Sequence, residues 1–533
     1  MTDNPYEPTT GGVSNESDSS GGDVFGHPRG LYYLFFAELW ERFSFYGMRA
    51  LLTLYLADEL FKDLADGKEI AYEIYAAYGS LVYFTPAIGG MIADRLIGHK
   101  NSIMLGALLM CIGHFTMAFQ SETIFYLSLG LLIIGNGFFK PNISSLVGGS
   151  YEEKDARRDG GFTIFYLGIN LGAFLAPLVC GYLGENYGWH YGFSAAGIGM
   201  FVGMVVFWWG GRTGVYGDQG NQPALYQSKS YSGLNVRHIV YILSFLSVPL
   251  FAYLVKSSQI EVFGLTGLLQ FLLITLLILV AIYLTLVCVK TDKVTRERLI
   301  VVVVLTFFVT VFWAFFEQAG SSLTLFAKEQ VRLVGLNASQ TNAINPFYIV
   351  VLAIPFSMMW NRLETAEKNP NTMIKFGLGI LQLGLGFLVF ALSARFIDDA
   401  GKVSMMFLLI GYLLITSGEL FLSPIGLSKV TELSPAKLVA FMMGVWFLSS
   451  SFAHYIAGAI AKLTTGGNAG GGGTLSGIAD QITGVAPGNA TPQVTNLFNY
   501  TTVFAQIAIV SFVIGLIAVI ISPIIKRMMH GIR

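Results

Sequence analysis

The sequence predicts an all-α membrane protein that crosses the bilayer fourteen times. Of its 533 residues, 54% are hydrophobic and only 12% are charged, and the mean hydropathy is +0.61. Soluble domains carry about 25% charged residues. The apolar residues also gather in runs of the ~20 residues that a membrane helix needs. A net charge of −1 offers no basic face for nucleic acid, so the composition predicts no nucleic-acid partner.

Fourteen apolar runs are long enough to form membrane helices. In chain order they cover residues 31–57, 70–94, 101–120, 122–148, 160–185, 190–210, 236–256, 262–290, 297–326, 339–360, 373–394, 403–428, 436–462 and 500–525. Residues 1–30 are rich in Gly, Ser and Asp and have no apolar core, so they predict a disordered tail and not a signal peptide. The glycine-rich insert 463–499 predicts an irregular aqueous loop.

Lysine and arginine are distributed unevenly over the connections. With fourteen spans, the loops and span ends on the side of the termini hold 21 of them, and those on the opposite side hold 8. Cytoplasmic loops carry the excess of Lys and Arg in membrane proteins. The sequence therefore predicts a multi-pass protein of the plasma (inner) membrane with both termini in the cytoplasm.

Seven charged residues fall well inside the predicted spans, where a charge near the bilayer centre costs at least ~2.5–3.5 kcal/mol. They are Glu38, Glu41, Arg42, Arg49, Lys140, Glu317 and Glu419. Such residues usually face a cavity or a partner, so each is a functional candidate. Burial favours the protonated, neutral form of a lone carboxylate, whereas a nearby cation favours its ionised form. A carboxylate that is switched between these two environments can carry a proton.

The first span concentrates polar residues on one face. Glu38, Glu41, Arg42, Tyr46 and Arg49 are spaced i, i+3, i+4, i+8 and i+11, which places them on one broad side of a helix. Glu38 and Arg42 can pair at i, i+4. A structural ion pair between helices is one interpretation. Two acids and two bases exceed what one bridge needs, which favours a cavity wall.

Further polar positions have two interpretations each. Lys140 precedes Pro141, and a kinked helix suits a cavity wall, although a lysine can also snorkel to the interface. Asn170 can bind a substrate or a neighbouring helix. Trp313 and Trp446 can pack between helices or line a pocket. Two histidines, His114 and His454, fit packed polar residues better than proton relays.

The residue pattern shows no zinc site, phosphate loop or nucleophile–base set, so we expect no metal, no cofactor and no enzyme. The three cysteines lie in apolar spans, which predicts packing and not a disulfide pair. They are Cys111, Cys180 and Cys288.

Five segments, in order and in the expected spans, resemble the proton-dependent oligopeptide transporter (POT/PTR) family of the major facilitator superfamily. They are the E-x-x-E-R element Glu38–Arg42 with Phe43–Gly47, then Gly90–Arg95 with Gly98, Phe139–Asn142, Phe165–Gly172 and Gly418–Leu420. The resemblance runs from about residue 31 to 526.

The resemblance implies the major facilitator fold. Two six-helix bundles would cover 31–210 and 297–526, a linker 211–296 would carry the two extra helices, and 527–533 would form a cytoplasmic tail. A central site would lie between the bundles, which would rock between outward-open and inward-open states.

The activity implied is proton-coupled import of di- and tripeptides, with peptides and protons as ligands, membrane lipid as the surroundings and no cofactor beyond the coupling proton. A carrier of nitrate or another small solute on the same fold is the alternative, although the acid Glu419 would repel an anion. A membrane receptor or a channel is the alternative of another class. Paired charges in both halves argue against a simple pore, and no soluble sensing domain is visible.

The resemblance also implies roles for individual residues. Arg49 and Lys140 would bind the peptide carboxylate, and Glu419 would bind its amino group. The other implied substrate-binding residues are Tyr46, Tyr78, Asn170, Trp313, Asn345, Trp446 and Ser450. The implied proton-coupling residues are Glu38, Glu41, Arg42 and Lys140, with Glu317 as a protonatable gate acid that can pair with Arg49.

Two features differ from the animal members of the family. The second span has Ala76 where animal members have a histidine, so proton coupling should rest on carboxylates. A short loop, 395–402, stands where animal peptide carriers have a large external domain. Both features predict a bacterial type.

Overall fold

The computed structural model describes residues 23–119, 121–152, 155–227, 229–231, 233–259, 261–262, 265–435, 437–466 and 474–532. The predicted disordered tail up to residue 22 lies outside this part of the chain, as does the glycine run at 470–473.

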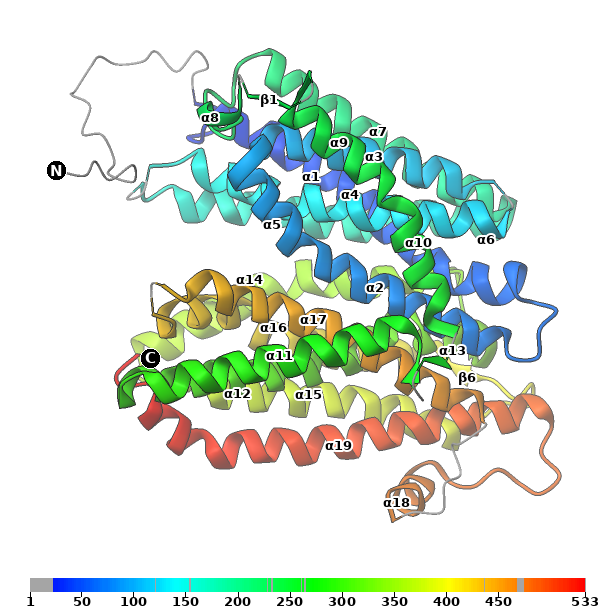
Figure 1. Ribbon diagram of the computed structural model, residues 1–533. Coiled ribbons are helices and arrows are strands. Elements are labelled where there is room, and N and C mark those ends of the chain that lie inside the picture. The colour runs from blue at the N-terminus through cyan, green and yellow to red at the C-terminus, as the bar shows by residue number, and fades with distance from the viewer. Residues whose placement is uncertain are drawn as a thin grey trace.

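The described chain is almost entirely helical (Figure 1). The first group of helices is α1 (Arg29–Tyr55), α2 (Gly67–Ile92), α3 (His99–Met117), α4 (Glu122–Gly149), α5 (Arg158–Ala176), α6 (Tyr182–Tyr187) and α7 (Trp189–Arg212). The second group is α12 (Lys293–Phe316), α13 (Ser322–Gln330), α14 (Ile344–Thr365), α15 (Thr372–Leu392), α16 (Met405–Leu433), α17 (Val439–Lys462), α18 (Thr474–Thr483) and α19 (Pro492–Met528).

A linker of short elements and two longer helical stretches joins the groups. It contains α8 (Ala224–Gln227), β1 (Ser230–Tyr231), β2 (Leu234–Asn235), α9 (Val236–Leu246), α10 (Val248–Lys256), β3 (Glu261–Val262), β4 (Leu265–Thr266) and α11 (Leu268–Lys290). β1 pairs antiparallel with β2, and β3 with β4. In the second group, β5 (Val331–Arg332) pairs in parallel with β6 (Val403–Ser404). The break between α9 and α10, at Ser247, precedes Pro249, whose ring fits only the first turn of a helix.

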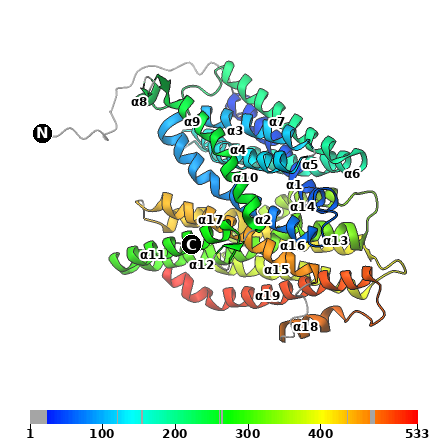
Figure 2. The ribbon, with the colours of Figure 1, turned by 45° about the vertical axis from the view of Figure 1, so that its right-hand side comes forward.

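Each group buries its own apolar core. In Figure 1 the first group lies above and the second below, and the two remain separate in the turned view of Figure 2. α10 packs against α4 of the first group, whereas α11 packs against α12 and α17 of the second. The linker therefore contacts both groups. The domain bounds drawn from the family resemblance stay a prediction.

Eleven helical stretches in the described residues are long and apolar enough to cross a membrane. α1, α3 and α17 are not among them, although they pack alongside the others. α1 fails for a clear reason, because four of the predicted intramembrane charges lie within its length. The predicted number of fourteen crossings remains a prediction.

Several stretches differ from the sequence-based expectation. The predicted span 236–256 is divided into α9 and α10, the predicted span 262–290 begins with β3 and β4, and two further differences bear on the second group. The predicted span 297–326 is interrupted: α12 ends at Phe316, a 3₁₀ turn covers Glu317–Gly320, and Ser321 leaves the helical region with φ −123° and ψ −99°. A Cβ atom on Gly320 would lie 1.9 Å from the Tyr75 hydroxyl, so only glycine permits this approach. Glu317 therefore sits at a helix break, and its side chain reaches Arg49 of the first group.

The insert 463–499 was expected to be irregular throughout, and this is wrong for two parts of it. It contains α18, and α19 begins at Pro492, eight residues before the predicted span. Thr491 caps α19 by accepting a hydrogen bond from the Val494 amide, and Pro492 occupies the first turn. The first turns of α19 are polar, so a prediction based on runs of apolar residues placed the start of this helix too late.

The helices alternate in direction, which gives the molecule two ends. The start of α1 and the end of α19 lie at the left of Figure 1, and we call this end the terminal face. The connections α1–α2 and α13–α14 lie at the opposite end, which we call the distal face.

Candidate functional site

A cavity of about 420 Å³ lies between the two groups of helices. Small-molecule sites have ~300–1,000 Å³, so this volume suits a small ligand. Twelve of the fourteen predicted site residues line it: Glu38, Arg42, Tyr46, Arg49, Lys140, Asn170, Trp313, Glu317, Asn345, Glu419, Trp446 and Ser450.

The acidic face of α1 forms a buried cluster in which two acids share one arginine. Arg42 Nε lies 3.2 Å from Glu38, and Arg42 also donates to Glu41 over 2.7 Å and through a second, shorter contact. All three residues are at most 3% exposed. The predicted Glu38–Arg42 pair is confirmed. Glu38 Oε2 has no hydrogen-bond partner among the described residues, so the cluster holds one more acid than its arginine satisfies.

Arg49 and Glu317 join the two groups of helices. The Arg49 guanidinium forms an ion pair with Glu317 from the end of α12 and donates from Nε to the Tyr75 hydroxyl over 2.6 Å. Tyr75 in turn donates to Glu317 over 3.4 Å. The predicted pairing of Arg49 with Glu317 is therefore present. A protonation step at Glu317 stays a prediction.

Lys140 is the second cation of the cavity, and it is held differently. Its Nζ lies 4.2 Å from the centre of the Tyr83 ring, a cation–π contact. No carboxylate in the described part of the chain lies within ion-pair distance of it. Tyr83 stacks on His454 with ring centres 4.8 Å apart, and His454 Nδ1 lies 3.6 Å from Glu317. Lys140 is thus the cation that a bound anion can meet without displacing a protein carboxylate.

Glu419 forms the opposite wall. It is 8% exposed and accepts a hydrogen bond from Asn345 Nδ2 over 3.0 Å, while Asn345 also donates to Thr416 over 3.0 Å. Within the described ranges no cation lies at ion-pair distance from Glu419. The cavity therefore presents an unpaired cation from the first group and an unpaired acid from the second.

Two predicted residues lie behind the lining. Glu41 is fully buried against Arg42, and Tyr78 is 2% exposed within the core of the first group. Tyr75 and Tyr83 contact the charged groups instead. Tyr75, Tyr78 and Tyr83 lie within nine residues of one another on α2. Which of them faces the cavity depends on how the helix is rotated, and the sequence alone does not show that rotation. Further lining residues that the prediction missed are Tyr166, Asn342, Tyr412 and His454.

The distal part of the seam between α2 and α17 is closed by a regular series of contacts. Ser80 and Ser451 hydroxyls lie 2.8 Å apart. About one turn further along α2 and two turns along α17, a Cβ atom on Gly458 would lie 2.3 Å from the Ala76 side chain, so the helices touch through small residues. The seam thus holds α2 and α17 together beside the cavity.

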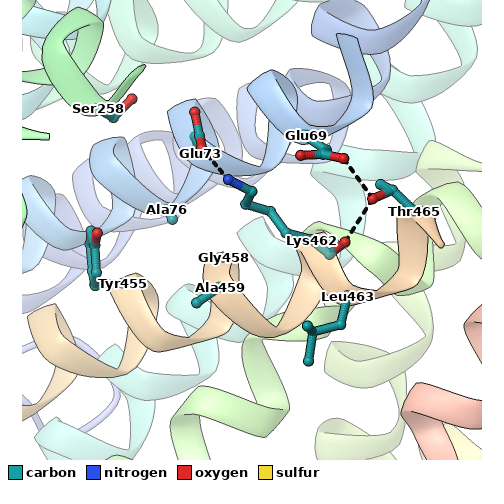
Figure 3. A pocket seen from close by; sticks show the side chains of 10 residues that line it. All are labelled: Glu69, Glu73, Ala76, Ser258, Tyr455, Gly458, Ala459, Lys462, Leu463 and Thr465. Carbon is teal, nitrogen blue, oxygen red and sulfur yellow. Dashed lines mark hydrogen bonds and ion pairs between the residues drawn. The ribbon is translucent and has the colours of Figure 1, made fainter. Parts of the chain in front are cut away.

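Polar pairs close the outermost turns of the same seam. Lys462 pairs with Glu73, and Thr465 donates to Glu69 over 2.9 Å (Figure 3). These side chains surround a second, smaller pocket of about 250 Å³. Figure 3 shows the lysine reaching from α17 across to α2.

Other pairs join the groups at the same end. Lys328 pairs with Asp58, Lys68 lies 2.7 Å from Glu329, and the Ser339 amide donates to Glu185 over 2.8 Å. These pairs lie between the cavity and the distal face. On the other side, the cavity lining includes the exposed Ser144, which lies near the end of α4 that points to the terminal face. The structure is therefore joined at the distal face, and its cavity reaches toward the terminal face.

Locking the distal seam should stop the two groups of helices from parting at that face. We expect a Ser80→Cys, Ser451→Cys variant in a background lacking the native cysteines to form a disulfide under a membrane-permeant oxidant, because the two hydroxyls already touch. Solute entry from the distal side should fall to background and return on reduction. The single-cysteine variants are the controls. Unchanged entry with a demonstrated disulfide would show that this seam does not part.

Comparison with known proteins is consistent across sequence and structure. The model of the POT family matches residues 100–474. The chain is 36% identical over 514 residues to the uncharacterized transporter YclF of Bacillus subtilis, covering 95% of this chain and 96% of the relative. It is 32% identical over 527 residues to the di-/tripeptide transporter of Lactococcus lactis subsp. lactis, covering 96% and 98%.

A solved structure of similar fold is the crystal structure of peptide transporter POT in complex with sulfate. The TM-score is 0.78 at 34% sequence identity, and the match covers 96% of this chain and 97% of the other.

Proposed function

Since the chain belongs to the POT family, we propose that it is a symporter that imports di- and tripeptides together with protons by alternating access. A relative of nearly equal length is named a di-/tripeptide transporter, which supports the substrate class. The observation that carries the proposal is the charge arrangement of the cavity, with Lys140 and Arg49 on one side and Glu419 on the other.

A short peptide matches this arrangement because it is a zwitterion. Its carboxylate would meet the unpaired Lys140, and its ammonium would meet Glu419, which has no cation of its own. A charge-assisted hydrogen bond is about twice as strong as a neutral one, so the two ends of the peptide fix its orientation. Asn170 and Asn345 line the cavity, where they would bond the peptide backbone.

Proton coupling would follow from competition for Arg49. Glu317 holds Arg49 across the two groups of helices, so the peptide carboxylate can engage Arg49 only when Glu317 lets go. A proton on Glu317 removes its charge and weakens the pair. Peptide and proton would then favour each other's binding, which is the linkage that a symporter needs.

The proposal includes the orientation in the membrane. Both termini would be cytoplasmic, following the excess of Lys and Arg on that side, and the distal face would then be external. The structure would be closed to the outside and open toward the cytoplasm. The site would use the proton as its coupling ion, need no other cofactor, and perform no catalytic step.

The substrate class is tested by competition. Purified protein in proteoliposomes should take up a labelled dipeptide, and unlabelled di- and tripeptides should compete with it. A dipeptide with a blocked amino group and a dipeptide amide should compete weakly, since each lacks one of the two charges. Nitrate should not compete. Competition by nitrate, with none by peptides, would contradict the proposal and favour a small-anion carrier.

Glu419→Gln should weaken dipeptide binding at least ~30-fold, since truncating one partner of a buried charge pair costs ~2–5 kcal/mol. Glutamine keeps the hydrogen bond with Asn345, so the wall itself should persist. Binding to the purified variant can be measured by calorimetry. A dipeptide with an acetylated amino group is the matched control, because it should bind wild type and variant equally weakly. An equal loss for both ligands would contradict the role of Glu419 as the ammonium partner.

A further inference from the structure

We propose that His454 is a further proton-coupling residue, which shares with Glu317 the proton that frees Arg49. The inference rests on the proposed function, because it concerns the proton that drives the symport. The sequence alone favoured a packed polar residue at this position, and the surroundings of the side chain change that interpretation.

His454 lies at the junction of the charged groups. It comes from α17 one turn after Ser450, lines the cavity and is 5% exposed. Its Nδ1 is 3.6 Å from Glu317 Oε2. Its ring stacks on the ring of Tyr83, which also makes the cation–π contact with Lys140. The imidazole therefore connects the gate acid with the second cation of the site.

The fold makes room for this ring. A Cβ atom on Gly79 of α2 would lie 2.5 Å from His454 Nδ1, so the imidazole rests directly on a glycine. Yet Nδ1 has no hydrogen-bond partner among the residues that the structure describes. An unsatisfied buried polar atom costs about 1–3 kcal/mol. The open nitrogen leaves Nδ1 able to accept a proton, and its position beside Glu317 gives that proton a carboxylate to face.

His114 shows what a packed histidine looks like in the same protein. It is 1% exposed on α3, and its Nδ1 also lacks a partner in the described structure. It does not line the cavity and lies within ion-pair distance of no described carboxylate. Burial and an open nitrogen are thus common to both histidines. Of the two histidines, only His454 lies beside a carboxylate and lines the cavity.

The groups around His454 make its protonation conditional. The Glu317 carboxylate at the end of α12 lies 3.6 Å from its Nδ1, whereas Arg49 of α1, paired with Glu317, and Lys140 of α4, on the Tyr83 ring, bring two cations to the same junction. A carboxylate favours an imidazolium, and nearby cations oppose it. The rings of Tyr75 and Tyr83 on α2 complete the surroundings. A peptide carboxylate at Lys140 and Arg49 would offset the two cations. Peptide binding would therefore make protonation of His454 more favourable.

The proton step is simple to balance. Neutral His454 takes a proton from water of the cavity onto Nδ1, and the new N–H donates to Glu317 once the gap of 3.6 Å closes to about 2.8 Å. The carboxylate then has an imidazolium as partner and can release Arg49 to the peptide. When the cavity opens to the cytoplasm, His454 returns the proton to water and Glu317 recovers Arg49.

The test is the pH profile of dipeptide uptake by the His454→Gln variant in proteoliposomes. Glutamine is polar and of similar length but does not titrate, so only a carboxylate is left to take up the proton. Reference pKa values are ~6.5 for histidine and ~4.3 for glutamate. We expect the rise of uptake with falling pH to move about one unit or more toward acid, and uptake at pH 6.5 to fall at least fivefold. His114→Gln is the matched control and should keep the wild-type profile.

Three outcomes would overturn the inference. The first is a His454→Gln profile that coincides with that of wild type. The second is an equal acid shift in His114→Gln. The third is failure of both His454→Gln and His454→Asn to yield monodisperse protein, which would assign the residue to folding. Wild type without any proton-driven dipeptide uptake would instead defeat the proposed function, so the two failures are distinguishable.

Discussion

Glu317→Gln should abolish accumulation of dipeptide against its gradient while leaving exchange of dipeptide across the membrane intact. Glutamine resembles a permanently protonated glutamate, so it cannot hold Arg49 as an ion pair. Arg49 would stay available to the peptide, and binding would persist. The variant could then carry peptide in both directions but could not link that movement to a proton.

The size of the effect follows from the gradient. One pH unit corresponds to about 1.4 kcal/mol, which supports about tenfold accumulation for each proton carried. Wild type should reach a ratio of this order in proteoliposomes, and Glu317→Gln should stay at a ratio of one. Glu122→Gln is a suitable control, because Glu122 pairs with Lys256 at a surface where both side chains are about half exposed. Wild-type accumulation by Glu317→Gln would remove Glu317 from the coupling mechanism.

Lys140→Ala should abolish gradient-driven uptake by another route, the loss of binding. Lys140 is the cavity cation that no described carboxylate neutralises, so it should make the first contact with the peptide carboxylate. Removing the partner of a buried charge costs ~2–5 kcal/mol, or at least ~30-fold in affinity. Unlike Glu317→Gln, this variant should lose exchange together with accumulation.

A peptide lacking the carboxylate separates this effect from general damage. The dipeptide amide should bind wild type weakly, and Lys140→Ala should weaken it little further. Lys140→Arg keeps a cation at the position and should retain part of the dipeptide affinity. Full uptake by Lys140→Ala, or an equal loss for the dipeptide and its amide, would argue against the assigned contact.

Most of the fold was predictable because burial in lipid demands long apolar runs. The bounds of α2, α4 and α15 lie within three residues of the predicted spans. The break at Glu317–Gly320 was not predicted, because the residues around it are apolar enough to continue the run; Gly320 meets Tyr75 of another helix there, a contact that the local sequence does not show. Helices with polar first turns, such as α19, were missed at their starts because the prediction relied on apolar runs.

The site was predictable where its residues carry a charge, because a charge inside a membrane span has a high free-energy cost. A charge inside a span is rare, so Glu317, Lys140 and Glu419 stood out in the sequence, and all three line the cavity. Tyr83 and His454 did not stand out, because a neutral aromatic or imidazole ring has a smaller free-energy cost in an apolar helix than a charge has. Their contribution depends on how α2 and α17 pack, with Gly79 beneath the imidazole, and only the three-dimensional arrangement reveals it.

Uptake of a labelled dipeptide by wild-type protein in proteoliposomes, with the internal pH recorded at the same time, tests the central claim most directly. With the outside one pH unit more acidic and no other gradient, dipeptide should accumulate inside above its external concentration. The lumen should acidify only when dipeptide is added. Abolishing the pH gradient with a protonophore should reduce the accumulation to equilibration. Accumulation without acidification, or acidification that does not depend on peptide, would contradict coupled transport of peptide and proton.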